Sequence, residues 1–135
     1  MEITKGEVFV PEQYYIITGE LSDHTLTFGL NEKVDLTSYT ATGNMLVDSD
    51  SLSFVYLLDG GEGYTYIRFQ EEVWTMLANV LDQDVNVVVT SEDDTSIELT
   101  DLKEELSYLV ENIKDNSNYG EVMNQAVEKV FLTAS

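Results

Sequence analysis

The chain has 135 residues and contains 26 Asp and Glu against only six Lys and Arg, which gives a formal net charge of -20 at neutral pH. A surface this negative repels phosphates, and both nucleic acids and anionic lipid headgroups are bound through Lys and Arg, so we expect neither nucleic acid nor a membrane as a partner. The absence of cysteine excludes disulfides, thiolate metal sites and thiol nucleophiles, and it fits the cytoplasmic location that we expect.

Size and apolar content predict a single domain over residues 1–135. The mass of 15.2 kDa lies near the commonest domain size. Apolar residues make up 43% of the chain and aromatic residues 10%, which is enough to build a core under the charged surface. Residues Met1 to Gly6 contain no apolar run, and no stretch approaches the roughly 18 apolar residues of a membrane helix, so we expect neither a signal peptide nor a membrane span.

The N-terminal part of the chain carries mainly strand signals. Val8–Val10 and Tyr14–Thr18 are rich in β-branched and aromatic residues and flank Pro11, which predicts a hairpin with the proline at a turn or an edge. The alternation of apolar and polar residues around Leu26 predicts another half-buried strand. From residue 31 to residue 42 the pattern is polar, which predicts a long, mobile loop.

The middle of the chain resumes the strand pattern and then changes to a helical one. Three strands are expected over Met45–Val47, Leu52–Leu58 and Tyr64–Phe69, and three glycines in the five residues before Tyr64 predict a hairpin turn between the last two. After Glu71 the apolar residues recur at helical spacing, which predicts a helix of about three turns. That helical face consists of Val73, Trp74, Leu77, Val80 and Leu81.

The C-terminal third predicts one more hairpin and two helices. Alternating valines up to Val89 and the segment Ile97–Leu99 indicate two strands joined by a short acidic turn. Asp101 and Glu104 have the spacing of a capping box and open a predicted helix whose apolar residues are Leu102, Leu106, Leu109, Val110 and Ile113. After a break at residues 116–120, in which Asn118 is expected to cap with Glu121, a last helix is predicted from Val122, Met123, Ala126, Val127, Val130 and Phe131.

These elements predict an α+β fold. Strands joined by tight turns favour an antiparallel sheet, here of about six or seven strands, and the apolar face of such a sheet needs a cover. The two C-terminal helices are the available cover, and one further helix lies between strands. No internal repeat or linker divides the chain.

Two stretches of the chain resemble a known family. They read GNMLVDSDSLSFVYLLDGGEGYTYIRFQEEVWTML, from Gly43 to Leu77, and LKEELSYLVENIKDNSNYGEVMNQAVEKVF, from Leu102 to Phe131. Both are similar to the YjbL-like uncharacterised proteins of low-GC Gram-positive bacteria, chiefly through MLVDSD, WTML and ENIKDNSNYG. The likeness covers roughly half of the chain, within residues 43–135, and little of residues 1–42. It implies a small bacterial cytoplasmic protein and supplies no activity, ligand or catalytic residue.

A calcium loop is the first candidate site. Asp48, Asp50 and Asp59 match the outer positions of an EF-hand loop, but Leu52 and Ser53 occupy inner positions where that loop needs an oxygen ligand and a glycine. We therefore interpret Asp48 and Asp50 as residues that cap a tight turn, and we expect no bound metal.

The densest acidic series is a second candidate and consists of Asp82, Asp84, Glu92, Asp93, Asp94, Glu98, Asp101, Glu104 and Glu105. We interpret it as a solvated face, because metal ligands must converge in space and half of these residues are predicted on exposed turns. Weak adsorption of a divalent cation remains an alternative.

No catalytic constellation is evident. His24 is the only imidazole, and beside Asp23 in a polar turn it is expected to be exposed rather than to activate a nucleophile. Paired carboxylates could in principle cleave a glycoside, but the chain has one Trp, predicted in the core, and little room for a sugar cleft. We expect no catalytic residue and no cofactor.

The leading hypothesis is a non-enzymatic protein-interaction or regulatory module that binds a partner with a basic or neutral surface. Arg68, the only arginine, either pairs with a neighbouring acid or anchors a carboxylate or phosphate. Tyr119 at a loop tip could be a contact residue. The candidate partner-binding residues are Asp48, Asp50, Arg68, Asn118, Tyr119 and Gly120. Two alternatives stay open: an inhibitor that mimics nucleic acid to occupy a basic protein, and a carboxylate-based or divalent-cation-dependent hydrolase.

Overall fold

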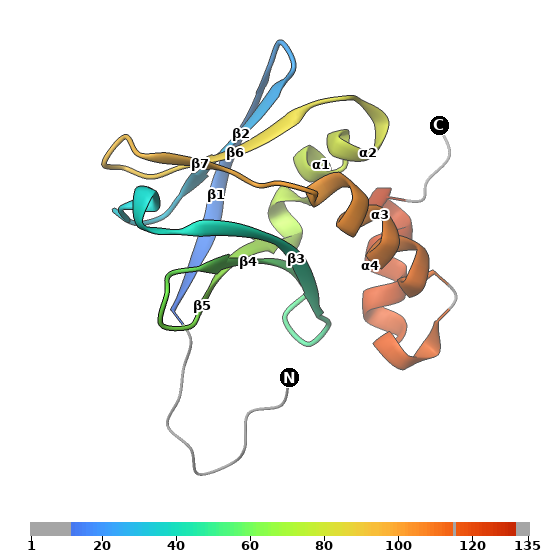
Figure 1. The fold of residues 1–135 in the computed structure, drawn as a ribbon. Helices are drawn as coiled ribbons and strands as arrows, with labels where there is room; N and C mark the ends of the chain where they lie inside the picture. The colour runs from blue at the N-terminus through green and yellow to red at the C-terminus, as the bar shows by residue number, and fades with distance from the viewer. Residues whose placement is uncertain (1–11, 115, 132–135) are drawn as a thin grey trace.

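The computed structural model describes residues 12–114 and 116–131, and its main feature is one strongly curled sheet (Figure 1). The predicted strand Val8–Val10 lies outside these residues. Seven strands form the sheet: β1 (Gln13–Ser22), β2 (Thr25–Leu30), β3 (Thr40–Asp48), β4 (Ser53–Asp59), β5 (Tyr64–Gln70), β6 (Asn86–Thr90) and β7 (Ser96–Glu98).

The sheet is mixed, and the prediction of an antiparallel sheet was wrong in this respect. The strand order is β3-β4-β5-β1-β2-β6-β7. The hairpins β1–β2, β3–β4, β4–β5 and β6–β7 are antiparallel, but β1 pairs with β5 and β2 pairs with β6 in parallel. The first hairpin lies in the middle of the sheet, so each of its outer edges accepts a strand that is distant in sequence. Local pattern predicts hairpins and carries no information about such distant pairings.

The β4–β5 hairpin shows why its glycines are needed. Gly61 and Gly63 have φ values of +95° and +135°, which side-chain-bearing residues rarely adopt, and Gly60 N–H closes the turn on the carbonyl of Gly63 at 3.2 Å. The predicted turn is confirmed.

The polar segment 31–42 is fastened rather than loose, and its last residues belong to β3. Val34, which precedes the 3₁₀ turn Leu36–Ser38, is buried, and so is Leu36, the first residue of that turn. Their backbone N–H groups donate to Ser91 Oγ at 2.6 Å and to Thr95 Oγ1 at 3.0 Å. Because these partners lie in the β6–β7 turn, the sequence around residue 35 gives no local sign of the attachment.

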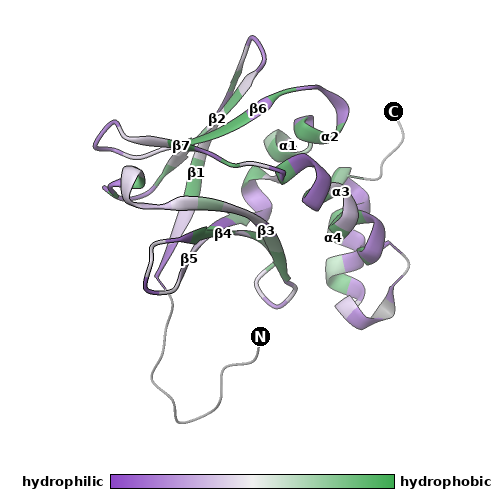
Figure 2. Cartoon of the chain, in the orientation of Figure 1, coloured by the Kyte–Doolittle hydropathy of each residue, from purple (hydrophilic) through white to green (hydrophobic). Residues whose placement is uncertain are grey.

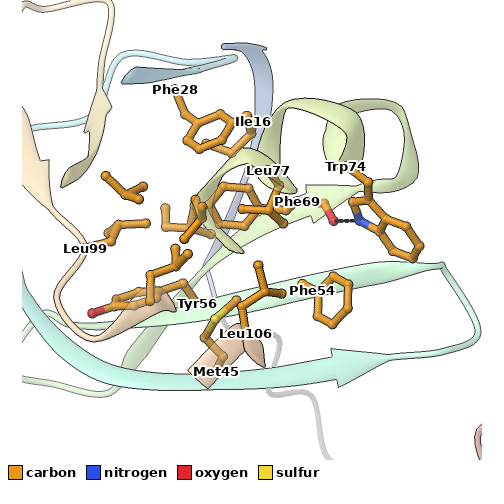
Figure 3. Close-up of a cluster of buried hydrophobic side chains, with 14 of the residues drawn as sticks. Ile16, Phe28, Met45, Phe54, Tyr56, Phe69, Trp74, Leu77, Leu99 and Leu106 are labelled. Carbon is orange, nitrogen blue, oxygen red and sulfur yellow. Dashed lines mark hydrogen bonds between the residues drawn. The ribbon is translucent and has the colours of Figure 1, made fainter. Parts of the chain in front are cut away.

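The segment after β5 folds into three short pieces instead of one helix. They are the 3₁₀ turn Glu71–Val73, α1 (Trp74–Leu77) and α2 (Asn79–Asp82). The predicted face is right where it matters most, because Trp74, Leu77 and Val80 are fully buried. The indole N–H of Trp74 donates to the carbonyl of Phe69 at 2.8 Å, which ties this segment to the end of β5 (Figure 3).

Two longer helices follow the sheet, α3 (Leu102–Ile113) and α4 (Glu121–Phe131), at the positions predicted. Both predicted caps are wrong. Asp101 precedes α3 with φ 58° and makes no side-chain capping bond, because a capping residue needs an extended backbone. Asn118 lies inside the 3₁₀ turn Ser117–Tyr119, so α4 begins after Gly120 and Glu121 is its first residue.

The core lies between the concave face of the sheet and the helices. Figure 3 shows aromatic and aliphatic side chains from β2, β4 and β5 meeting those of α1 and α3. Trp74 packs against Phe54 of β4 and Phe131 of α4 at centroid distances of 5.1 and 5.5 Å, so one indole joins the sheet to the last helix. Figure 2 shows the apolar residues concentrated along the middle of the strands, with the hairpin tips hydrophilic.

The two edges of the curled sheet approach each other, and a buried tyrosine closes the gap. Tyr56 Oη accepts a hydrogen bond from Gly43 N–H of β3 at 2.9 Å and donates one to the carbonyl of Thr100, just after β7, at 2.7 Å. Gly43 has φ +77° at a break in the β3–β4 register, and a Cβ there would lie 2.9 Å from Asp101 Oδ2. We call the group Gly43, Tyr56, Thr100 and Asp101 the seam.

Candidate binding site

The turn between β3 and β4 is held by the only arginine of the chain. Arg68, on β5, donates from Nη1 to Asp48 Oδ2 at 3.0 Å and to Ser51 Oγ at 3.3 Å, and from Nε to Gln13 Oε1 at 2.6 Å. Asp48 Oδ1 in turn accepts from the backbone N–H of Ser51 at 3.4 Å. The guanidinium therefore binds three elements of its own chain, which confirms the reading in which Arg68 pairs with a neighbouring acid.

These contacts change the pKa of Asp48. Partial burial by itself would raise its pKa, but the hydrogen bonds from Ser51 and Arg68, together with the arginine charge, outweigh burial and hold the pKa of Asp48 below its usual value. The carboxylate is therefore ionised, and the ion pair intact, at neutral pH.

The last residue of the same turn has an unusual backbone. Leu52 has φ +50°, in the left-handed region that glycine and asparagine adopt most readily. A leucine there costs of order 1–3 kcal/mol when the surroundings hold it in place. Its side chain is partly buried and packs on the edge of the core.

The connection from α3 to α4 forms the second wall of the site. The side chain of Asn116 accepts the backbone N–H of Asn118 at 3.0 Å and so organises the 3₁₀ turn, and Gly120 follows with φ +87°. Asn124 donates from Nδ2 to the carbonyl of Ile113 at 2.5 Å, which ties the start of α4 to the end of α3. Val122, one of the apolar residues from which this helix was predicted, is 69% exposed because it lies about 100° around the helix from buried Met123.

The turn and the start of α4 together line an open pocket of about 350 Å³. Both segments lie on the same side of the molecule in Figure 1. We call this cavity the turn pocket; it is lined by Ser49, Asp50, Leu52, Tyr119, Gly120, Glu121, Val122 and Met123.

The structure brings together part of the predicted set of partner-binding residues. Asp50, Tyr119 and Gly120 line the turn pocket although 69 or more positions separate Asp50 from the other two. Asp48 and Arg68 lie behind the turn as its ion pair rather than in the pocket. Asn118 is exposed beside the pocket and does not line it.

Sequence reasoning missed the apolar part of the site. Leu52 carries no sign in the sequence of its left-handed backbone, and Val122 was counted among the apolar residues that mark the last helix, without being recognised as exposed. The usable signal was positional: Val122 lies at the margin of that stripe, one residue before Met123, where a helical residue can face outward.

The structure does not bring together the residues of the other candidate sites. Asp48 and Asp59 lie at opposite ends of the β3–β4 hairpin, because Asp48 pairs with Ser53 at the first residue of β4 and Asp59 is its last, so the calcium-loop pattern does not converge. His24 is exposed in the β1–β2 turn, as expected. Among residues 12–114 and 116–131, no group of three or more His, Cys, Asp or Glu is placed to hold a metal ion.

The acidic series is exposed, but it is spread over the end of α2, the β6–β7 turn and the start of α3 rather than gathered at one place. All of its members except Glu105 are exposed. Four of them, Asp84, Glu98, Asp101 and Glu104, line a shallow hollow of about 150 Å³ between β6, the end of β7 and the start of α3. This hollow is much smaller than the roughly 300–1,000 Å³ of typical ligand pockets.

Within the part of the chain that the structure describes, no helix combines the length and the apolar character needed to cross a bilayer.

Comparison with known proteins identifies a family. The model of a family of unknown function, UPF0738, matches residues 14–131, so the likeness extends into the N-terminal strands. The chain is 43% identical to the UPF0738 protein YjbL of Bacillus subtilis over 87% of its own length and 95% of that protein. It is 42% identical to a UPF0738 protein of Bacillus cytotoxicus, over 76% and 82% of the two chains. No solved structure matches significantly. The chain belongs to the UPF0738 family.

Proposed function

We propose that this protein is a non-enzymatic, cytoplasmic interaction module that binds a partner protein of basic or neutral surface at the turn pocket. The observation that carries the proposal is the pocket itself: two segments far apart in the sequence line an open pocket of about 350 Å³ and leave Val122 69% exposed at its margin. Concave sites lined by apolar side chains with a few polar groups are the preferred places for binding, and here Leu52, Tyr119 and Val122 supply the apolar part of the lining.

The geometry supports binding better than catalysis. Two carboxylates, Asp50 and Glu121, line the pocket, but both residues are exposed, and Glu121 Oε1 is engaged by Gln125 Nε2 at 3.0 Å. Catalytic carboxylates depend on burial and on charged neighbours to tune their proton affinity, and a site open to water weakens electrostatic stabilisation of a transition state. The lining also contains no His or Lys that could act as a general base.

Tyr119 is a lining residue of a type that contributes strongly to binding free energy. Tyrosine combines a large apolar ring with a polar end and is enriched among the residues that dominate binding energies. The surrounding charge contributes in another way, because an acidic surface speeds encounter with a basic partner and makes the rate sensitive to salt.

Site-specific photo-crosslinking tests the proposal. A benzophenone amino acid replaces Val122 in the full chain, and the matched control carries it at Ile17, which is 55% exposed on β1. The expected result is one partner protein crosslinked in cells from position 122 and absent from position 17. The purified partner should then bind the wild type, and Val122→Asp should weaken that binding about tenfold or more. Equal capture from both positions, or none from position 122, contradicts the proposal.

The exposed acidic series favours one second candidate, mimicry of a nucleic-acid backbone. All of its members except Glu105 are exposed, and carboxylates in solvent produce a negative field that a basic groove would meet favourably. In that case polynucleotide would displace the partner from the protein, and neutralising Asp84 and Glu98 would weaken binding more than Val122→Asp does.

A further inference from the structure

We infer that the turn pocket receives one large apolar side chain of the partner, flanked in the partner's sequence by Lys or Arg. The inference rests on the proposed function and specifies the ligand of the same pocket. It commits to an extended protein segment and excludes an anionic ligand.

The apolar requirement follows from the lining. Leu52 comes from the turn and exposed Val122 comes from α4, so each wall of the pocket contributes an aliphatic side chain, whereas Met123 is only 1% exposed and belongs to the core. Leu52 is the informative residue, because glycine or asparagine would hold the same backbone at φ +50° without the strain. The leucine side chain packs against the edge of the core and also gives the pocket apolar surface, and neither glycine nor asparagine would supply these contacts.

The charge requirement follows from the rim. Asp50 stands on one wall and Glu121 on the other, and the lining contains no cationic residue. The whole chain adds a formal charge of -20, so a segment with negative side chains would be repelled on approach. Lys or Arg on either side of the apolar residue would meet Asp50 and Glu121 while the apolar residue fills the space between them.

The size requirement follows from the volume. A cavity of about 350 Å³ lies at the lower end of the roughly 300–1,000 Å³ range of ligand pockets. It suits one aromatic or long aliphatic side chain with part of its backbone better than a nucleotide or a large cofactor.

Three synthetic peptides test this chemistry directly. The probe has the sequence Gly-Lys-Lys-Phe-Lys-Lys-Gly, one control replaces Phe by Gly, and the other replaces every Lys by Glu. Titration into the ¹⁵N-labelled full chain should shift the amide signals of Leu52, Tyr119 and Val122 with the probe. The affinity of the Phe-to-Gly peptide should be lower than that of the probe by roughly a factor of ten or more, and the acidic peptide should produce no shifts. Equal binding of the probe and the Phe-to-Gly peptide, or shifts confined to the acidic series, overturns the inference.

Two variants locate the contact. Leu52→Asn keeps a residue that tolerates positive φ, and Val122→Asp changes an exposed position, so both should fold. Each should weaken the probe roughly tenfold or more, whereas Ile17→Asp, also at an exposed position, should not. Unchanged probe affinity in both pocket variants would overturn the inference.

Mapping the crosslinked partner separates the two proposals. If benzophenone at position 122 captures a partner whose crosslinked peptide contains an apolar residue between Lys or Arg residues, both proposals are supported. If the captured peptide is acidic or lacks an apolar residue, the proposed function stands and this inference fails. Failure to capture a partner, with the peptide probe still binding as expected, contradicts the proposed function alone.

Discussion

The seam and the turn pocket both involve β3, but they are stabilised in different ways. At the seam, the hydroxyl of buried Tyr56 satisfies two backbone groups, and Gly43 has φ +77°, a conformation that residues with a side chain rarely adopt. At the turn pocket, a partly exposed ion pair, with 15% of the Arg68 side chain and 33% of the Asp48 side chain accessible, holds a turn that carries a strained leucine. The seam is held by the hydrogen bonds of a buried side chain, whereas the turn is held by a partly exposed ion pair and lines a pocket.

Loss of the Tyr56 hydroxyl should have the largest effect on stability. Burial raises the pKa of Tyr56, so the hydroxyl stays protonated and donates throughout the physiological range. Tyr56→Phe would leave Gly43 N–H and the Thr100 carbonyl without this partner, and we expect a loss of about 1–3 kcal/mol in the free energy of unfolding, measured with urea. Tyr64→Phe, at a 51% exposed position, is the matched control and should change it by less than about 0.5 kcal/mol. Equal effects would erase the distinction between the two regions.

Removal of the ion pair should have a smaller effect on stability and a detectable effect on the site. We expect Arg68→Gln to lower the free energy of unfolding by about 0.5–1 kcal/mol, since partly exposed pairs are screened by solvent. A double-mutant cycle with Asp48→Asn measures the coupling. Because Arg68 positions the turn, Arg68→Gln should also weaken the peptide probe, whereas Tyr56→Phe should not. The reverse pattern would make the seam, and not the turn, the support of the pocket.

The same pair predicts a pH dependence. The pKa of Asp48 in the folded protein lies below its ordinary value of 3.8, so its stabilising contribution is fully present above that value. The contribution is lost as the pH falls through the lower folded-state pKa. Asp35 and Asp93 also have lowered pKa values, through hydrogen bonds from Thr37 and Thr95 respectively, but they are common to both proteins and cancel in a difference.

Urea unfolding of the wild type and of Arg68→Gln between about pH 6 and about pH 2 measures this difference. The gap in stability between the two proteins should be constant above about pH 4 and shrink below it. A gap that widens on acidification would show that Asp48 is not stabilised by Arg68.

The smallest expected effect comes from the exposed acids beside the seam. Replacing Asp84 and Glu98 by Asn and Gln should raise Tm by about 1–2 °C in low salt, because it relieves repulsion on an exposed acidic face. The difference should vanish near 1 M NaCl, where the Debye length is about 3 Å, and the Tm of the wild type should itself rise with salt. A flat or falling Tm would show that these charges are compensated or too far apart to interact.

Local pattern was sufficient for elements that depend on neighbours along the chain. The repeat of Leu102, Leu106 and Val110 predicts α3 at its observed boundaries, and the glycines before Tyr64 predict a turn that only positive φ values can make. Both signals are physical properties of a few consecutive residues. The candidate site was partly predictable for the same reason, because Tyr119 and Gly120 stand in an evident break between two helices.

Strand pairings and side-chain contacts between residues far apart in the sequence could be found only from the tertiary structure. No local rule pairs β1 with β5, attaches Val34 to Ser91, or assigns the guanidinium of Arg68 to Asp48. Caps failed in the same way: Asp101 has the right type and spacing, but its backbone is held in a left-handed conformation beside Gly43.

The sequence by itself determined the acidic character, the hairpins β4–β5 and β6–β7 and the two C-terminal helices, because charge and periodicity are properties of neighbouring residues. The tertiary structure alone decided the mixed order of the strands and the closure of the sheet at the seam. It also decided that Leu52, which the pattern places in a strand, and Val122, which the pattern places in the last helix, line the same pocket. Pairing across long separations depends on which surfaces fit in space, and that information is distributed over the whole chain.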